Sequence, residues 1–365
     1  MAKSATKTFG ILTSGGDCPG LNAAIRGVAK CAYGMYDMNI IGISRGYRGL
    51  IEGDVNLLKP GDFSGLLTKP GTILGTSREK PFKNVDDMRD AAYGRTKPEA
   101  IKENYKQFNM DCLVVLGGNG TDKTANMLAE EGLNVIGMPK TIDNDLYGTD
   151  VTFGFHSAVD IATDAIDRLH STAHSHNRIM VIEVMGHKAG WLGLYSGIAG
   201  GGDVILIPEI PYNMDSIARH LLKRASKGKE FSIVVVAEGA MSEKEAAMSK
   251  KERKAKRKKD SAPSIGYIVA RQIEESTGMD ARVTVLGYQQ RGGTPSPYDR
   301  LLATRFGTEA AKLLYKGKYG QMIALDGDDV VTRSLEDIAG KLKTVPKKDP
   351  MVETGRLVGT CFGDD

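Results

Sequence analysis

The sequence predicts an α/β protein built from two domains, each with a mostly parallel sheet covered by helices. The chain has 365 residues, which is long for one core and short for three. Short apolar runs alternate with helix-like stretches, the pattern that βαβ units with parallel strands produce. Glycine is abundant, with 44 residues, and many of them fall where a predicted strand ends.

Both halves of the chain follow this alternation. In the first half, strands and helices are expected at 9–14, 20–33, 40–44, 111–118, 121–132 and 134–138. In the second half, they are expected at 156–174, 178–186, 203–209, 231–239, 266–276 and 282–287. Ligands of such sheets bind at the carboxyl ends of the strands, so the loops that follow the strands are the candidate site.

A lysine-rich segment interrupts the second half at 241–260. Its run "KKERKAKRKK" (250–259) has eight basic residues and one Glu, a net charge of +7, which leaves −3 for the rest of the chain. The segment is expected to be an exposed helix or a mobile loop with solvated charges. A nucleic-acid-binding patch is the alternative. No aromatic residue interleaves the run, so no nucleic-acid partner is expected.

Cysteine and histidine patterns bear on compartment and metal chemistry. The four cysteines are scattered: Cys18, Cys31, Cys112 and Cys361. With no signal peptide and no apolar run of about 18 residues, the chain is expected to be cytoplasmic, without a membrane partner. One predicted helix carries His170, His174 and His176. A zinc site there would need a further ligand and a general base, so metal binding by these histidines is disfavoured.

Two glycine-rich corners follow predicted strands and open helices. They are "TSGGDCPG" (13–20) and "GGNGT" (117–121). Backbone N–H groups at such corners, with the helix dipole behind them, can receive a phosphate. Neither is a GxGxxG or Walker A motif, and for the first corner alone an ordinary turn is an equal alternative. Two corners in one domain suit a polyphosphate better than a single phosphate.

A charged loop follows the strand at 134–138. In "PKTIDND" (139–145), Lys140, Asp143 and Asp145 lie within six residues, a set that can serve a proton, a metal ion or an anionic substrate. Elsewhere, four arginines stand at strand ends and corners: Arg78, Arg178, Arg282 and Arg291. Each alone is a candidate surface ion-pair partner, but together, at ligand-facing ends, they favour bidentate phosphate recognition.

Together and in order, these stretches resemble the 6-phosphofructokinase family. The matching segments are "GILTSGGDCPGLNAAIRG", "GGNGT", "PKTIDND", "GTDVTFGFHSAV", "SHNRIMVIEVMGHKAGWL", "AEG" and "ARVTVLGYQQRGGTPS". The resemblance extends from about Phe9 to about Gly307. It implies two Rossmann-like three-layer αβα domains with the active site in the cleft between them. It also implies phosphorylation of fructose 6-phosphate to fructose 1,6-bisphosphate, a glycolytic reaction, with Mg²⁺ as cofactor.

The resemblance assigns one substrate to each domain. The donor-binding domain is expected at 1–153 plus about 291–340. The sugar-phosphate domain is expected at 154–290 plus the C-terminal tail, with the lysine-rich segment 241–260 inserted. In the bacterial family, the counterparts of Arg178 and Arg282 reach across a subunit interface, which implies a homodimer or a homotetramer.

The resemblance also assigns roles to residues. Asp143 is the implied general base, Thr141 positions the acceptor beside it, and Arg78 reaches the transferring phosphate. The implied metal-associated residues are Asn119 and Asp145. The implied donor-binding set is Gly15, Arg78, Glu79, Gly118, Asn119, Gly120 and Thr121. The implied sugar-phosphate set is Thr141, Ile142, Asp143, Arg178, Met185, Gly186, His187, Glu238, Arg282, Tyr288 and Arg291.

Two positions bear on the phosphoryl donor and disagree. Family members that use ATP have Gly at the position of Gly120, which leaves room for the α-phosphate, whereas diphosphate users have Asp. Lys140 stands where many bacterial ATP users have Gly and diphosphate users have Lys. The combination resembles the mixed-substrate branch. Gly120 is given more weight, because it decides whether the nucleotide fits, so ATP is the expected donor and diphosphate the alternative.

Three further positions depart from the family pattern. Asn119 replaces an Asp associated with Mg²⁺, and an amide oxygen brings no negative charge to the metal. His187 replaces an arginine near the sugar phosphate, and Tyr288 replaces a frequent histidine, although both can hydrogen-bond phosphate oxygens. Asn119 and His187 leave a second class of function open, a non-catalytic sugar-phosphate-binding regulatory subunit.

Overall fold

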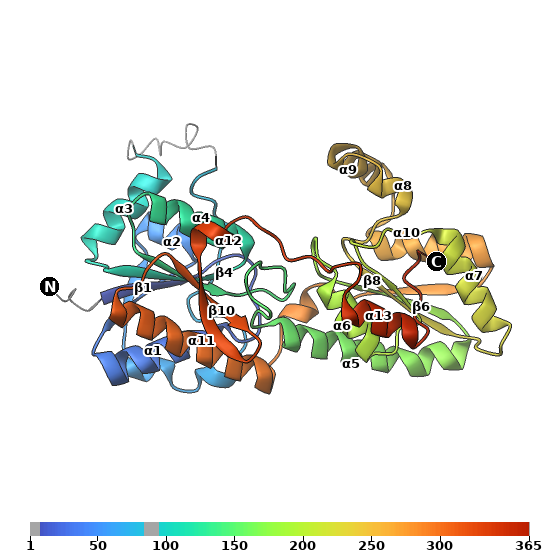
Figure 1. The fold of residues 1–365 in the computed structure, drawn as a ribbon, viewed down its shortest axis with the longest axis horizontal. Helices are drawn as coiled ribbons and strands as arrows, with labels where there is room; N and C mark the ends of the chain where they lie inside the picture. The colour runs from blue at the N-terminus through green and yellow to red at the C-terminus, as the bar shows by residue number, and fades with distance from the viewer. Residues whose placement is uncertain (1–7, 84–94, 365) are drawn as a thin grey trace. The chain divides into compact units, whose positions relative to one another are not determined.

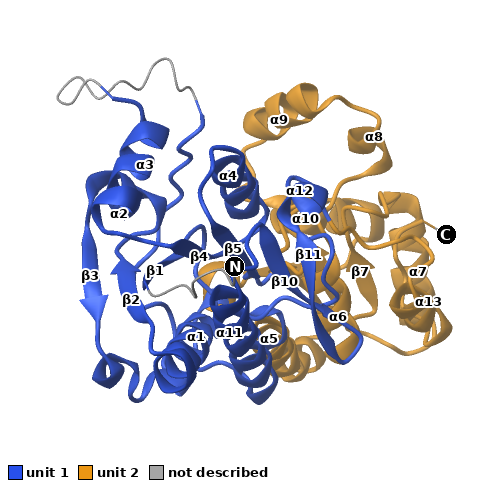
Figure 2. Ribbon diagram, turned by 60° about the vertical axis from the view of Figure 1, so that its left-hand side comes forward, with its two compact units in different colours: residues 1–142, 146–157, 291–342 blue, residues 143–145, 158–290, 343–365 orange. Residues whose placement is uncertain are grey.

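The computed structural model describes residues 8–83 and 95–364, and the chain forms two compact units (Figures 1 and 2). Unit 1 comprises Met1–Ile142, Leu146–Ser157 and Arg291–Leu342. Unit 2 comprises Asp143–Asp145, Ala158–Gln290 and Lys343–Asp365. The three residues Asp143–Asp145 thus belong to unit 2, although the strand before them and the segment after them belong to unit 1.

Unit 1 contains a seven-stranded sheet in the order β11-β10-β5-β4-β1-β2-β3. The strands are β1 (Thr8–Thr13), β2 (Asn39–Ile43), β3 (Val55–Leu58), β4 (Cys112–Gly117), β5 (Val135–Pro139), β10 (Gln321–Asp326) and β11 (Asp329–Ser334). The five inner strands are parallel, and the edge strands β3 and β11 are antiparallel to their neighbours. Because β5, β4 and β1 are parallel neighbours, their carboxyl ends lie along one edge of the sheet.

Helices cover both faces of this sheet (Figure 2). One face carries α1 (Leu21–Tyr36) and α11 (Pro297–Lys316), and the other carries α2 (Tyr47–Glu52), α3 (Lys97–Gln107), α4 (Asn119–Glu130) and α12 (Leu335–Ile338). The contact between α1 and α11 requires glycine, since a Cβ at Gly307 would lie 2.6 Å from the backbone nitrogen of Val28. On the face covered by α2, α3 and α4, Leu12 and Val115 of the sheet and Leu128 of α4 are fully buried, so their side chains stabilise the fold by leaving water.

Unit 2 contains a four-stranded parallel sheet in the order β7-β8-β6-β9. The strands are β6 (Ile179–Val184), β7 (Val204–Leu206), β8 (Ser232–Ala237) and β9 (Ala281–Val285). The strands β6, β7 and β8 are uninterrupted apolar runs except for Glu183 and Ser232, as expected for strands buried on both faces.

Helices also cover both faces of the unit 2 sheet (Figure 1). One face carries α7 (Met214–Ala225) and α10 (Ile265–Thr277), and the other carries α5 (Phe155–His176), α6 (Trp191–Ala199) and α13 (Pro350–Leu357). Ile217, Leu221 and Val269 are fully buried against the strands. Each unit is therefore a three-layer αβα structure, which confirms the predicted fold class.

The predicted alternation of strands and helices is confirmed, with element ends within three residues of those expected. The sequence analysis left the tail after Gly320 open. In the structure, its first part forms the hairpin β10–β11, which extends the unit 1 sheet beside β5. Its last part adds α13 to unit 2, where the backbone N–H of Ile205 donates to the carbonyl of Cys361 at 3.0 Å.

The lysine-rich segment forms two short helices, α8 (Glu243–Ala246) and α9 (Lys250–Lys259). The helix alternative of the prediction is therefore the correct one, and no residue of α9 is buried. Within the described parts of the chain, none of the helices is both long enough and apolar enough to span a membrane.

Candidate functional site

The candidate donor site lies at the edge of unit 1 where β1, β4 and β5 end. Three loops leave this edge: 14–20 after β1, the turn into α4 after β4, and 140–145 after β5. Parallel pairing of the three strands brings loops that are distant in sequence to one place. The sequence analysis placed the donor-binding corners and the charged loop in these segments.

Gly15 shapes the first loop. Its φ of +88° is a conformation that residues with a Cβ rarely adopt. Its N–H donates to the carbonyl of Ser77 at 2.9 Å, and its carbonyl accepts from the Thr76 hydroxyl at 2.7 Å. These two bonds fix the segment 76–77 against the loop. The neighbouring Arg78, predicted to reach the transferring phosphate, is exposed just beyond them.

Two cationic side chains lie against the same loop. The Nζ of Lys140, a residue only 3% exposed, donates to the carbonyl of Gly16 and lies 3.6 Å from where a Cβ of Gly15 would be. The Nη1 of Arg291 donates to the carbonyl of Asp17 at 2.9 Å. The sequence analysis grouped Arg291 with the sugar-phosphate residues, but the structure places it in unit 1, against the donor loop. Lys140 and Arg291 are therefore two cations at this edge that can bind a phosphate, beside the acidic residues of the same loops.

The second corner begins α4. Gly118 precedes the helix in an extended conformation, and the N–H groups of Thr121 and Asp122 bond back to its carbonyl. Gly120 is exposed, and a Cβ there would meet nothing within 4 Å. The N-terminus of α4 thus presents open space beside Gly120, together with the positive end of the helix dipole.

Two other predicted donor residues already have protein partners. The Asn119 amide nitrogen donates to the carbonyl of Lys341, which orients the amide and leaves its Oδ1 available as a neutral oxygen ligand. Glu79 forms an ion pair with Lys97 in α3. Asn119 therefore remains a candidate ligand, whereas Glu79 would have to leave Lys97 before contacting a nucleotide.

The third loop contains the predicted catalytic residues. The Thr141 carbonyl accepts from the Thr152 hydroxyl at 2.7 Å, and Ile142 is fully buried, so only its backbone can meet a substrate. Asp143 and Asp145 are 9% and 7% exposed. The backbone carbonyl of Asp145 accepts from the N–H of Lys343 at 2.9 Å. The loop is thus held by its backbone on both sides of the two carboxylates.

The other predicted sugar-phosphate residues, apart from those after β5 and Arg291, occupy two edges of the unit 2 sheet. At the carboxyl edge, Met185–His187 follow β6 and Glu238 follows β8. Gly186 and His187 both have positive φ, +143° and +48°, and the N–H of His187 donates to the Glu238 Oε1 at 2.8 Å. Tyr288, after β9, is 78% exposed. These loops therefore form one preorganised group around the Glu238 carboxylate.

Gln290 joins two of these loops and was missed by the sequence analysis. Its side chain is fully buried, its Oε1 accepts from the Met185 N–H at 3.2 Å, and its Nε2 donates to the Gly287 carbonyl at 3.1 Å. The signal for it was weak, since a glutamine beside an arginine and two glycines looks like an exposed turn residue.

Arg178 and Arg282 lie at the opposite edge of this sheet. Arg178 immediately precedes β6, and Arg282 is the second residue of β9. They share a carboxylate, because Arg178 binds the Asp280 Oδ2 at 2.6 Å and Arg282 also pairs with Asp280. The expectation that all four arginines stand at ligand-facing strand ends is therefore wrong for these two within a single chain. In a parallel strand, a residue before the strand lies at the amino edge.

Two of the three α5 histidines considered as zinc ligands make other contacts. The Nε2 of His170 lies 2.7 Å from the carbonyl of Gly200, and the rings of His170 and His174 both pack edge-on against Phe231. In the ranges 8–83 and 95–364, no group of three or more His, Cys, Asp or Glu residues is arranged to hold a metal. The described residues thus offer no preformed all-protein metal cage. This is compatible with Mg²⁺, which usually binds through one or two protein oxygens plus substrate phosphates.

Known proteins resemble the chain over its whole length. The sequence profile of the phosphofructokinase family matches residues 8–314. The chain is 70% identical to an ATP-dependent 6-phosphofructokinase of Spirochaeta thermophila over 364 residues, covering 100% of both chains. It is 54% identical to ATP-dependent 6-phosphofructokinase 3 of Bacteroides thetaiotaomicron, covering 97% of this chain and 99% of that one.

A solved structure supports the same relationship. The phosphofructokinase of Saccharomyces cerevisiae matches with a TM-score of 0.77 and 30% identity, over 91% of this chain and 45% of the yeast chain. The chain thus spans less than half the length of the yeast protein, whereas it matches the two bacterial relatives almost end to end. The chain belongs to the phosphofructokinase family.

Proposed function

We propose that the protein transfers the terminal phosphoryl group of ATP to the 1-hydroxyl of fructose 6-phosphate, forming fructose 1,6-bisphosphate in glycolysis. The observation that carries this proposal is the full-length similarity to two relatives named as ATP-dependent 6-phosphofructokinases, at 70% and 54% identity. The edge of unit 1, where Lys140 and Arg291 contact the loop after β1, supplies the phosphate-binding chemistry that the activity needs.

The choice of ATP over diphosphate is supported at Gly120. No atom of the described residues lies within 4 Å of a Cβ at this position, which leaves space where the ATP-using family members accommodate the α-phosphate. Lys140 bonds to the carbonyl of Gly16, and an ammonium at that place can neutralise a terminal phosphate of either donor. The lysine is therefore compatible with ATP, and a diphosphate-dependent enzyme is not favoured.

Asp143 is the proposed general base. Phosphoryl transfer depends mainly on alignment and on neutralising charge, with one carboxylate accepting the proton of the attacking hydroxyl. Asp143 accepts that proton from the 1-hydroxyl of the sugar phosphate, while Thr141 orients the acceptor. Arg78, which is exposed next to the segment bonded to Gly15, contacts the transferring phosphate.

Mg²⁺ is proposed to accompany ATP. Two oxygens of the chain suit it, the neutral Oδ1 of Asn119 and the carboxylate of Asp145. When bound, Mg²⁺ neutralises charge on the transferring phosphates. Since Asn119 contributes no charge, Asp145 is the only carboxylate in this pair, and metal affinity in the absence of nucleotide is expected to be low.

Fructose 6-phosphate is proposed to bind to unit 2. Glu238 accepts hydrogen bonds from sugar hydroxyls, and His187 and Tyr288 donate to the phosphate. Arg178 and Arg282 stand at the other edge of the sheet and already share Asp280. They are therefore proposed to serve the phosphate of a neighbouring subunit in a homodimer or homotetramer.

The first test compares the two donors. Initial rates of fructose 1,6-bisphosphate formation would be measured with fructose 6-phosphate, Mg²⁺ and either ATP or diphosphate, using one preparation of protein. Turnover with ATP alone is expected. Turnover with diphosphate alone would mean that Lys140 outweighs the open space at Gly120. No turnover with either, in a folded protein that binds fructose 6-phosphate, would favour a regulatory subunit.

A further inference from the structure

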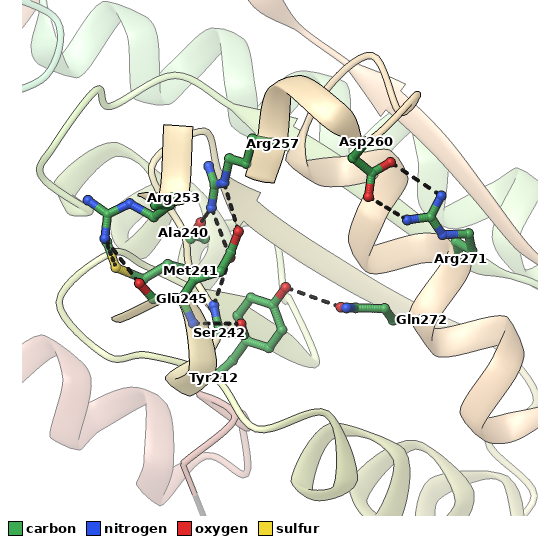
Figure 3. A network of polar contacts seen from close by, with 10 residues as sticks. All are labelled: Tyr212, Ala240, Met241, Ser242, Glu245, Arg253, Arg257, Asp260, Arg271 and Gln272. Carbon is green, nitrogen blue, oxygen red and sulfur yellow. Dashed lines mark hydrogen bonds and ion pairs between the residues drawn. The ribbon is translucent and has the colours of Figure 1, made fainter. Parts of the chain in front are cut away.

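The lysine-rich segment that the proposed mechanism leaves unused begins three residues after Glu238. It forms the connection between β8 and α10, and it contains the helices α8 and α9 (Figure 1). None of the lysines of α9 makes a side-chain hydrogen bond or ion pair with a described residue of the chain. The lysines are exposed. The contacts of α9 with the rest of unit 2 are made instead by its two arginines (Figure 3).

Arg257 makes the closest of these contacts. Its Nε and Nη2 donate to the two carboxylate oxygens of Glu245 at 3.0 and 3.1 Å, and Nη2 also donates to the carbonyl of Ala240 at 2.6 Å (Figure 3). Glu245 is 4% exposed. Burial raises the pKa of its carboxyl group, but Arg257 and the backbone of Ser242 outweigh burial, so the pKa is lowered overall. The pair is therefore a charged, bidentate clamp.

The clamp holds the end of the loop that carries Glu238. The N–H of Ala240 donates to the carbonyl of Ala237 at 2.8 Å, and the N–H of Glu238 donates to the carbonyl of Val184 at 2.8 Å. The Glu238 carboxylate in turn accepts from the N–H of His187. A continuous series of bonds therefore connects α9 with the loop that bears the predicted sugar ligands.

A second set of contacts fixes the next residues of the loop. Tyr212 pairs with the loop through its backbone, its N–H donating to the carbonyl of Met241 and its carbonyl accepting from the N–H of Glu243, both at 3.0 Å. Arg253 contributes two longer contacts, to the Met241 sulfur at 3.2 Å and to the Glu245 carbonyl at 3.4 Å. Arg257 is thus the only side chain of α9 that bonds to the segment 238–240.

We propose that α8 and α9 brace the sugar-phosphate loop, and that Arg257 is a positioning residue for fructose 6-phosphate. It acts through the Ala240 carbonyl to hold Glu238 and its neighbours in their binding conformation. The planar guanidinium holds both carboxylate oxygens of Glu245 through Nε and Nη2 while Nη2 also bonds to Ala240, whereas a lysine has a single nitrogen and cannot form the bidentate pair. The inference rests on the proposed role of Glu238 in binding the sugar phosphate.

The test compares Arg257→Met with Arg271→Met. Arg271 in α10 is the matched control, because it pairs with Asp260 at 2.8 Å at the other end of the segment and does not contact 238–240. For Arg257→Met, the Kd and the KM for fructose 6-phosphate should rise by about 5- to 30-fold. This is the cost of ordering roughly one backbone residue of the loop each time the sugar phosphate binds. The KM for ATP and the kcat should stay within about twofold.

Two further measurements separate positioning from general destabilisation. Amide hydrogen exchange over 238–242 should accelerate in Arg257→Met and not in Arg271→Met, with the strands of unit 1 unchanged in both. Arg257→Lys should recover part of the lost affinity, because the ammonium restores the positive charge and a donor for Ala240 but lacks the second nitrogen of the bidentate pair with Glu245. Should Arg257→Met fail to fold, this lysine variant carries the comparison alone.

The outcomes are distinguishable. A wild-type protein that binds no fructose 6-phosphate would overturn the proposed function and the inference with it. A wild-type protein that binds the sugar phosphate, with an unchanged Kd in both Arg257 variants, would overturn the inference alone. An equal rise in the KM values for both substrates, with a fall in kcat, would also overturn it, because that pattern indicates a general loss of structure.

Discussion

The carboxyl edges of the two sheets differ in their cationic side chains. At the edge of unit 1, Lys140 and Arg291 both donate to the loop after β1, with Arg78 exposed beside it. The loops at the corresponding edge of unit 2, at 185–188, 207–209, 238–240 and 286–290, contain no arginine and only one lysine, Lys188. One edge has the cations that a polyphosphate needs, and the other is built around a carboxylate.

Two arginines of unit 2 that were predicted to bind the sugar phosphate, Arg178 and Arg282, lie at the amino edge of its sheet. Arg178 is separated from Met185–His187 by the length of β6, six residues or about 20 Å, and Arg282 pairs in register with Met180, near the start of that strand. There they are neutralised by Asp280, and Arg282 also lies 3.7 Å from Glu274. The comparison teaches that the donor edge has cations in its own loops, whereas Arg178 and Arg282 can serve a sugar phosphate at the carboxyl edge of unit 2 only if they belong to another chain, as proposed.

The largest expected effect concerns Asp143, the proposed general base. Asp143→Ser should lower kcat by a factor of about 10² to 10⁴, because it removes the general base, while the Kd for fructose 6-phosphate changes little. Steady-state kinetics and calorimetric titration of the sugar phosphate would measure the two quantities. Equal losses of turnover and of sugar binding would show that Asp143 organises the site rather than accepting a proton.

The next prediction tests the amino edge directly. Arg178→Met should raise the KM for fructose 6-phosphate by about 10- to 100-fold, the range for a lost charged contact to phosphate. Co-expression with Asp143→Ser would then regenerate intact sites if Arg178 serves the neighbouring subunit. With symmetric dimers formed at random, and fructose 6-phosphate held well below the KM of Arg178→Met, about a quarter of the wild-type activity should return.

The control for this experiment is the pair Arg178→Met with Arg282→Met. If both arginines of one chain serve the same neighbouring site, this mixture regenerates no intact site and its activity should stay low. Failure of Asp143→Ser to complement Arg178→Met, in dimers shown to exchange, would place Arg178 in the site of its own chain. Arg178 would then have to move from the position described here to reach the sugar phosphate of its own chain.

A smaller effect is expected at the donor edge. Gly120→Asp places a carboxylate in the open space at the start of α4, so the KM for ATP should rise by about tenfold through repulsion of the α-phosphate. Folding should be unaffected, because an acidic residue suits the first turn of a helix. Gly34→Asp, in α1, is the control, since it adds the same charge at another exposed glycine with nothing within 4 Å of its Cβ.

The sequence predicted the strands and their ends better than the side-chain contacts between distant segments. Apolar runs and glycine corners identified the strands β1, β4 and β5, and hence the edge where their loops meet. The hairpin β10–β11 was missed, although "LDGDD" (325–329) contains an Asp-Gly turn signal between two apolar runs. The strands that were found and the hairpin that was missed all carry their signal in a short stretch of sequence.

Other features depend on tertiary contacts that no local pattern encodes. Asn119 bonds to Lys341, 222 residues away, and Gln290 links the turn at Gly287 to Met185. The position of Arg178 was predictable, because a residue before a parallel strand lies at the amino edge, but the expectation treated every strand end as equivalent. The direction of a strand matters as much as its ends.

The smallest effect is expected from a buried thiol behind the donor edge. Burial raises the pKa of Cys18 to about 12 against the opposing influence of Lys140, and its Sγ–H donates to the Phe153 carbonyl at 3.6 Å. At pH 8 the thiol is therefore neutral and unreactive, and it adds no negative charge to the edge. A thiol reagent at pH 8 should label the partly exposed Cys31 and leave turnover unchanged, with Cys31→Ser abolishing the label. Loss of activity in step with labelling of Cys18 would mean that the donor edge opens in solution, and that its charge is less fixed than the comparison with unit 2 assumes.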